Sequence, residues 1–171
     1  NVRRIALLGV LTSLTIVLSI FESFIPSIGI PGIKLGLANI VIIIVLYELG
    51  IIDAVIVNLL RVILCSLLRG NIFSMGFFMS FAGAFLSLGI MIIFYLFLKN
   101  FSIIAVSVIG SLFHVFGQIL VAMIFLSTAY ILYYLPIISL SAIVTGILVG
   151  ITSRLIIKTK IVSRIKDKYS I

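Results

Sequence analysis

The amino-acid sequence predicts an all-α membrane protein with six transmembrane helices, and three observations lead to this fold class. First, 64% of the 171 residues are hydrophobic, only 9% are charged, and the mean hydropathy is +1.51. Soluble domains are about half apolar and about a quarter charged. Second, no run alternates apolar and polar residues with the period of two that a transmembrane β-barrel requires. Third, backbone groups in lipid must be satisfied within each segment, so the apolar segments are expected to be helices.

Charges and turn residues divide the chain into six apolar segments, at roughly 5–25, 36–49, 53–69, 75–98, 102–127 and 137–157. A helix that crosses the bilayer core needs about 20 residues. The second segment is shorter than this, so we expect a short or deeply embedded helix there. The whole chain, 1–171, is expected to form a single integral membrane domain that ends in a basic tail, 158–171. Because the sequence begins with Asn1 rather than Met, we expect further residues before it.

The distribution of basic residues predicts the orientation of the helices. With six spans both termini lie on one side, and that side carries most of the cations: Arg3, Arg4, Lys99, Arg154, Lys158, Lys160, Arg164, Lys166 and Lys168. The opposite side keeps only Lys34 and Arg69. Cytoplasmic loops carry an excess of Lys and Arg, so both termini are expected in the cytoplasm. We attribute the net charge of +8 to this bias and to a tail that contacts anionic lipid, and we expect no nucleic-acid binding.

A cation in the middle of the third segment marks the first candidate site residue. Arg61 lies within AVIVNLLRVILCSLL, with Asn58 three residues before it and Cys65 and Arg69 four and eight residues after it. These spacings place the four side chains on one helix face. A charged residue at the bilayer centre is costly and usually faces the interior of the bundle. A guanidinium suits carboxylate or phosphate, so we expect an anion site. The alternative is a structural ion pair with Glu22, Glu48 or Asp53.

The fifth segment carries the second candidate pair. His114 and Gln118 are four residues apart in GSLFHVFGQILVA and share a helix face. Together they would orient the polar group of a ligand, or alternatively bridge helices by a hydrogen bond worth ~0.6–2 kcal/mol in membranes. His114 is the only histidine, which excludes a site with several histidine ligands within this chain. We expect no metal site.

The segment PGIKLGLAN (31–39) is unusually polar and glycine-rich for so apolar a chain. Pro31, Gly32 and Gly36 would fold a re-entrant outer loop, because irregular backbone is tolerated at membrane depth where protein covers it. Lys34 and Asn39 would then point into the bundle. The sequence therefore predicts an outward-opening pocket for a small molecule that carries carboxylate or phosphate, lined by Lys34, Asn39, Arg61, Arg69, Asn71, His114 and Gln118, with Tyr133 and Tyr134 at its rim.

Several motifs that carry chemistry are absent from the sequence. It has no G-x-x-x-x-G-K-[ST] loop for ATP and no Cys-His cluster for zinc, haem or iron–sulfur. Only four acidic residues are present, which is too few for an aspartate-rich site that holds Mg²⁺ on a diphosphate. We therefore expect neither enzyme activity nor a cofactor in this chain.

The motifs PGIKLGLANI, RVILCSLLRG, SFAGAFLSL and GSLFHVFGQILVA, in this order, resemble one family of bacterial membrane proteins. It is named heptaprenyl diphosphate synthase component I, or the Gx transporter family. The resemblance covers about residues 4–157. Val115 departs from it, because we expect Asn after His114. The family is similar to the substrate-binding S components of energy-coupling factor (ECF) transporters, which have six helices and cytoplasmic termini. The expected location is the bacterial cytoplasmic membrane.

The resemblance implies several partners. The chain would capture an isoprenoid- or flavin-related molecule on the outer side. It would then dock on an ECF transmembrane coupling subunit driven by two cytoplasmic ATPase subunits. The docking residues would be Ala6, Gly9 and Ser13, although Gly9 and Ser13 form a small-residue pair that would also suit internal packing. The family name implies an alternative, a membrane accessory subunit of prenyl diphosphate synthesis. A third possibility is an indirect role in flavin- or quinone-linked extracellular electron transfer.

Overall fold

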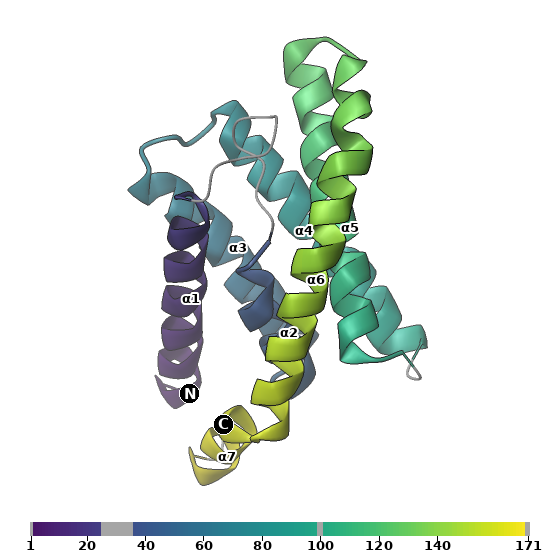
Figure 1. Cartoon of the computed structure of the whole chain (residues 1–171). Coiled ribbons are helices and arrows are strands. Elements are labelled where there is room, and N and C mark those ends of the chain that lie inside the picture. Colours follow the sequence, from purple (N-terminus) through teal and green to yellow (C-terminus); the bar gives the residue numbers. More distant parts are fainter. Residues whose placement is uncertain (1, 25–35, 99–100, 170–171) are drawn as a thin grey trace.

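The structure, a computed structural model, describes residues 2–24, 36–98 and 101–169, and every regular element in these ranges is a helix (Figure 1). Five helical stretches are long and apolar enough to cross a membrane, and one apolar helix is shorter. The predicted all-helical membrane fold with a short second helix is therefore confirmed. The elements are α1 (Val2–Glu22), α2 (Asn39–Glu48), α3 (Ile51–Leu68), α4 (Met75–Phe97), α5 (Ile103–Leu126), the 3₁₀ helix η1 (Tyr130–Tyr134), α6 (Leu135–Lys158) and α7 (Ile161–Tyr169).

Local sequence signals explain where several helices begin. The side chains of Ser74 and Ser102 cap α4 and α5, accepting hydrogen bonds from the backbone N–H of Phe77 at 3.3 Å and of Ala105 at 3.2 Å. Serine is a preferred residue at this position because its oxygen satisfies a free backbone donor. Pro136 lies in the first turn of α6, where the missing N–H has no partner to lose.

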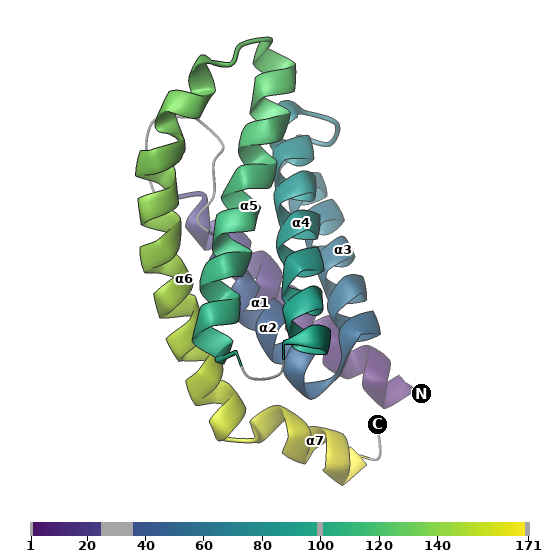
Figure 2. The same cartoon turned by 90° about the vertical axis from the view of Figure 1, so that its right-hand side faces the viewer.

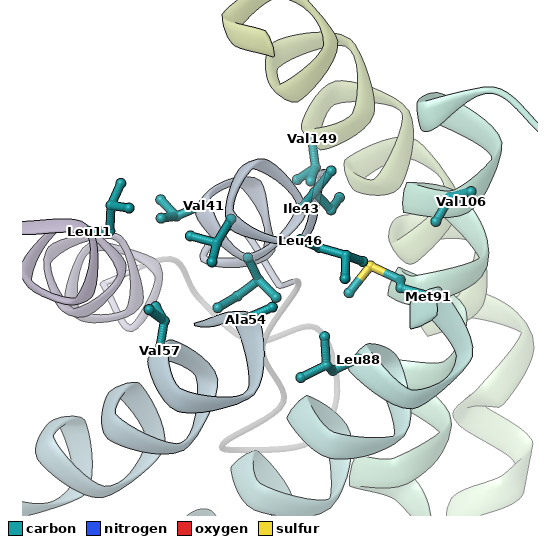
Figure 3. Close-up of a cluster of buried hydrophobic side chains, with 12 residues drawn as sticks. Leu11, Val41, Ile43, Leu46, Ala54, Val57, Leu88, Met91, Val106 and Val149 are labelled. Atoms are coloured by element: carbon teal, nitrogen blue, oxygen red, sulfur yellow. The ribbon is translucent and has the colours of Figure 1, made fainter. Parts of the chain in front are cut away.

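The short helix α2 lies at the centre of the bundle. Its residues from Val41 to Leu46 are each at most 4% exposed, as expected for a helix that is apolar on all sides. Figure 3 shows Val41, Ile43 and Leu46 among side chains from the surrounding helices α1, α3, α4, α5 and α6. Ten residues of helix measure about 15 Å, roughly half of the hydrocarbon core. The α2 helix is thus a buried central helix that is too short to cross the bilayer core.

Two polar contacts show how α2 fits into the topology. The side chains of Arg4 and Asp53 form an ion pair at 2.7 Å near the start of α1 and α3. The guanidinium of Arg69, just after α3, donates a hydrogen bond to the carbonyl of Ser19 near the end of α1. Helices α1 and α3 therefore run in the same direction. The chain between them returns through α2, so that α2 replaces a full crossing and the start of α1 and α7 lie at the same end of the bundle (Figures 1 and 2).

The basic tail contains a helix that the sequence analysis does not predict. Lys160 adopts a left-handed conformation with φ of 54°, which ends α6 and turns the chain. Helix α7 then lies across the end of the bundle (Figure 2). It alternates apolar residues such as Val162, which is 9% exposed, with basic ones such as Arg164. A helix with this pattern is typical of a membrane surface.

Candidate functional site

A small polar cavity of about 20 Å³ lies between α1, α3, α4 and α5. Each residue that lines it is at most 9% exposed, although most of these side chains are polar or charged. A cavity of this size holds about one water molecule, so the helices are closely packed around it. The lining residues are Ser19, Glu22, Arg61, Val62, Cys65, Ser66, Ser80 and His114.

Glu22 joins the end of α1 to the turn that precedes α2. Its carboxylate accepts hydrogen bonds from the backbone N–H of Gly36 and, at 3.3 Å, from that of Leu37. Gly36 has a φ of +88°, a conformation that other residues rarely adopt. The Glu22 carboxylate also acts through its charge on the guanidinium of Arg61, with which it shares the cavity. Of the acidic partners proposed for Arg61 from the sequence, Asp53 is instead paired with Arg4.

His114 and Gln118 form a polar pair within α5. Their Nε2 atoms lie 3.1 Å apart, and both residues are at most 3% exposed. This contact joins successive turns of α5, whereas the sequence-based alternative was a bridge between helices. A Cβ added to Gly83 of α4 would lie 2.7 Å from the carbonyl oxygen of His114 and 3.0 Å from Cγ of Gln118. The backbone of α4 therefore lies directly against this turn of α5.

Asn39 and Asn58 complete the polar interior. The Asn39 side chain, 2% exposed, donates to the hydroxyl of Ser87 on α4 at 3.3 Å. A Cβ added to Gly36 would lie 3.1 Å from Nδ2 of Asn39 and 3.8 Å from the ring of His114. The side chain of Asn58 donates to the carbonyl of Ala84 at 3.1 Å. Of the residues predicted for the site, Asn39, Arg61, His114 and Gln118 are thus buried in one region of the bundle.

Among the residues predicted for the site, Arg61 and His114 line the cavity, and the others that the structure describes do not. Lys34 lies outside the residues that the structure describes. Arg69 bonds to Ser19, and Asn71 lies in the turn between α3 and α4. Tyr133 and Tyr134 are 79% and 46% exposed and lie in η1, at the tip of the α5–α6 hairpin (Figure 2). The structure places these two tyrosines at a helix end, where membrane proteins commonly carry aromatic residues.

Sequence reasoning did not assign Glu22, Ser19, Ser66 or Ser80 to the site. One signal was available for Glu22, because an acidic residue at the end of an otherwise apolar span suggests a specific partner. The serines gave no such signal, since serine also occurs commonly at helix contacts in membranes. In the ranges that the structure covers, no three His, Cys, Asp or Glu side chains come together as possible metal ligands.

Replacing Gly36 with alanine tests how tightly this region is built. We expect Gly36→Ala to lower the melting temperature in detergent more than Gly70→Ala does. Both glycines have positive φ, at 88° and 64°, but an added Cβ meets Asn39 only at Gly36 and no atom within 4 Å at Gly70. Backbone strain costs roughly 1–2 kcal/mol in both variants, and the difference between them measures the contact at the site. Equal melting temperatures would contradict a close contact between Gly36 and Asn39.

The predicted docking residues lie on the outside of α1. Ala6, Gly9 and Ser13 are all exposed, and no atom lies within 4 Å of a Cβ added to Gly9. The hydroxyl of Ser13 donates to the carbonyl of Gly9 at 2.9 Å, which satisfies it within the helix. This face of α1 is therefore available to lipid or to another membrane helix.

Comparison with known proteins places the chain in a family. Residues 11–156 match the family described as heptaprenyl diphosphate synthase component I. The match covers all of α2–α5, half of α1 and nearly all of α6, including every residue that lines the cavity. No curated protein and no solved structure matches the chain.

Proposed function

This chain belongs to the heptaprenyl diphosphate synthase component I family, and we propose that it is a substrate-binding membrane subunit similar to an ECF S component. In this proposal it captures a small anionic or amphiphilic molecule, related to an isoprenoid or a flavin, from the outer side of the bacterial cytoplasmic membrane. A transmembrane coupling subunit and two cytoplasmic ATPase subunits then drive uptake. The chain itself is not an enzyme and carries no cofactor, and both of its termini are cytoplasmic.

The observation that supports this proposal is the charged cluster inside the bundle. Glu22 and Arg61 are 4% and 5% exposed in helices that are long and apolar enough to cross a membrane. An arginine at the centre of a span costs about 2.5–3.5 kcal/mol on insertion, and ionisable residues at such positions commonly mark substrate or ion pathways. A guanidinium beside polar side chains suits a carboxylate or phosphate ligand.

In this proposal the structure represents a closed state of the site. Pockets for small molecules commonly measure about 300–1,000 Å³, whereas this cavity measures about 20 Å³. Ligand binding therefore requires that helices or the turn before α2 move apart. Glu22 holds that turn at Gly36 and Leu37, and we expect this connection to open when the ligand enters.

The family description favours a second candidate function, a membrane accessory subunit of prenyl diphosphate synthesis. In that case the catalytic aspartates would belong to a soluble prenyl transferase, and this chain would hold the transferase at the membrane.

Purification with native partners separates the two candidates. A tagged chain is extracted from its own membranes in mild detergent, and the proteins that accompany it are identified by mass spectrometry. A transporter subunit is expected with an ATPase-bearing membrane complex, and an accessory subunit with the soluble transferase.

The variant Gly9→Leu makes this experiment specific to the exposed face of α1. We expect it to reduce the co-purified ATPase by about tenfold or more, because a loss of ~1.4 kcal/mol in binding is already tenfold. The chain should still fold, since a side chain at Gly9 meets no other residue. Gly89→Leu is the matched control, because Gly89 on α4 is equally open. An ATPase complex that both variants retain would contradict docking through α1. The absence of any ATPase partner from the wild type would refute the transport function.

A further inference from the structure

We propose that Glu22 occupies an anion-binding site of this chain from within, and that a carboxylate or phosphate group of the ligand competes with it for the same site. The site consists of the backbone N–H groups of Gly36 and Leu37 together with the guanidinium of Arg61. This inference rests on the proposed substrate-binding function, and it adds the chemical class of the ligand and the group that the ligand displaces.

The donors around Glu22 form a typical arrangement for an anion. Two successive backbone N–H groups point at one carboxylate oxygen, with a glycine of positive φ as the first of the two residues. Successive N–H groups around such a residue form a concave anion site in many proteins. The guanidinium adds a fixed positive charge that pairs well with carboxylate and phosphate.

Arg61 provides an independent reason to expect a further anionic or polar group. Its side chain is 95% buried and lines the cavity. Within residues 2–24, 36–98 and 101–169 no hydrogen bond joins its guanidinium to another protein group, and the carboxylate of Glu22 is the acidic group whose charge acts on it. A buried charge costs free energy unless its donors find acceptors. The guanidinium therefore presents donors to the cavity that an oxygen of a ligand would satisfy.

The geometry makes the two occupants mutually exclusive. A cavity of about 20 Å³ has room for one oxygen-sized group, so a carboxylate or phosphate fits only if the Glu22 side chain withdraws. Withdrawal would release Gly36 and Leu37 and with them the start of the central helix α2. Anion binding is thereby linked to the turn that leads into the core of the bundle. The tethered Glu22 carboxylate also lowers the apparent affinity for a free anion, as an internal competitor at high effective concentration.

The test compares Glu22→Gln with the wild type in detergent, using inorganic phosphate as the probe. Glutamine keeps the shape and one acceptor oxygen but removes the competing charge. We expect phosphate to raise the melting temperature of Glu22→Gln with an apparent Kd at least about tenfold lower than in the wild type. The double variant Glu22→Gln/Arg61→Gln should lose this response. Sodium chloride at equal ionic strength controls for screening, and dihexanoyl phosphatidic acid distinguishes a lipid head group from a free anion.

A phosphate affinity of Glu22→Gln no higher than that of the wild type would overturn the proposal. An equal response in the double variant would also overturn it. If Glu22→Gln does not fold, Glu22→Asp decides, because its shorter carboxylate should compete less and give an intermediate gain. These outcomes do not depend on co-purification of an ATPase complex. Phosphate binding without an ATPase partner would support this site and refute the transport function. An ATPase partner without phosphate binding would support the transport function and refute the site.

Discussion

Replacing Arg61 with methionine is expected to destabilise the folded chain by about 3–5 kcal/mol. Methionine has a similar length and is apolar, so the main change is that the carboxylate of Glu22 loses its positive partner. Removing one member of a buried pair costs this much because the remaining charge loses the attraction that offsets part of its burial. Glu22 is 4% exposed and cannot reach water without a rearrangement of the bundle. Unfolding of the detergent-solubilised protein in increasing dodecyl sulfate measures the loss.

The double variant Arg61→Met/Glu22→Gln shows whether the pair is responsible. Removing both charges should restore most of the stability, because a neutral glutamine still accepts the N–H groups of Gly36 and Leu37. The double-mutant cycle should therefore give a coupling energy of about 1–3 kcal/mol, within the range found for residues coupled in one polar network. If the two single losses simply add, the charges of Glu22 and Arg61 do not interact, and the arrangement described above is wrong.

The sequence was sufficient to predict the fold class, because lipid imposes one strong rule on the backbone. Apolar segments of sufficient length must be helices, and the boundaries follow from charges and turn residues. The short second helix was predictable for the same reason, since few residues separate Lys34 from Glu48. The asymmetry of Lys and Arg predicted that both termini share one side, and the structure has the start of α1 and α7 at the same end.

For the partners of the charged residues the sequence offered alternatives without a choice, such as Glu22, Glu48 or Asp53 as the acidic partner of Arg61. Helical spacing correctly gave a buried face with Asn58, Arg61 and Cys65, which are at most 5% exposed. It did not show that Glu22 shares the cavity with Arg61, or that Arg69 bonds to the carbonyl of Ser19. Both arrangements bring α1 next to α3, although the whole of α2 separates these helices along the chain. Periodicity within one helix carries no information about which residue of another helix lies opposite.

Helix α7, in the basic tail, is a second feature that the sequence did not predict. Its basic residues favoured a charged segment at the membrane surface, and the sequence analysis assigned no helix to it. The structure shows α7 in this segment, separated from α6 by Lys160 in the left-handed conformation. A glycine commonly occupies this position at a helix end, but here it is Lys160, for which the left-handed conformation is uncommon. The sequence therefore carries no signal that marks the end of α6. Val162 is 9% exposed and α7 contacts α6, and such contact stabilises a helix too short to be stable alone.

Replacing Gly117 with leucine is expected to destabilise the contact between α4 and α5 by about 3 kcal/mol or more. A Cβ added at Gly117 would lie 2.8 Å from the carbonyl oxygen of Ala82 and 2.9 Å from Cα of Gly83. These are backbone atoms of the facing helix and cannot rotate away, so the helices must separate. Overpacking by single methylenes already costs roughly 1–3 kcal/mol, and close approach of small residues is the main attraction between helices in lipid.

The stability of Gly89→Leu is the control, because it shows the effect of a glycine-to-leucine change at a helix position that makes no such contact. Gly89 lies on α4 with no atom within 4 Å of an added Cβ, so its leucine points away from the other helices and the melting temperature should hardly change. Gly117→Leu should in addition disturb the site, because His114 and Gln118 pack against Gly83 through the same contact. Phosphate binding is compared between Glu22→Gln and the double variant Glu22→Gln/Gly117→Leu. If the double variant is less stable but binds phosphate equally well, the cavity does not depend on this contact. Equal stability of the Gly117 and Gly89 variants would contradict the close approach of α4 and α5.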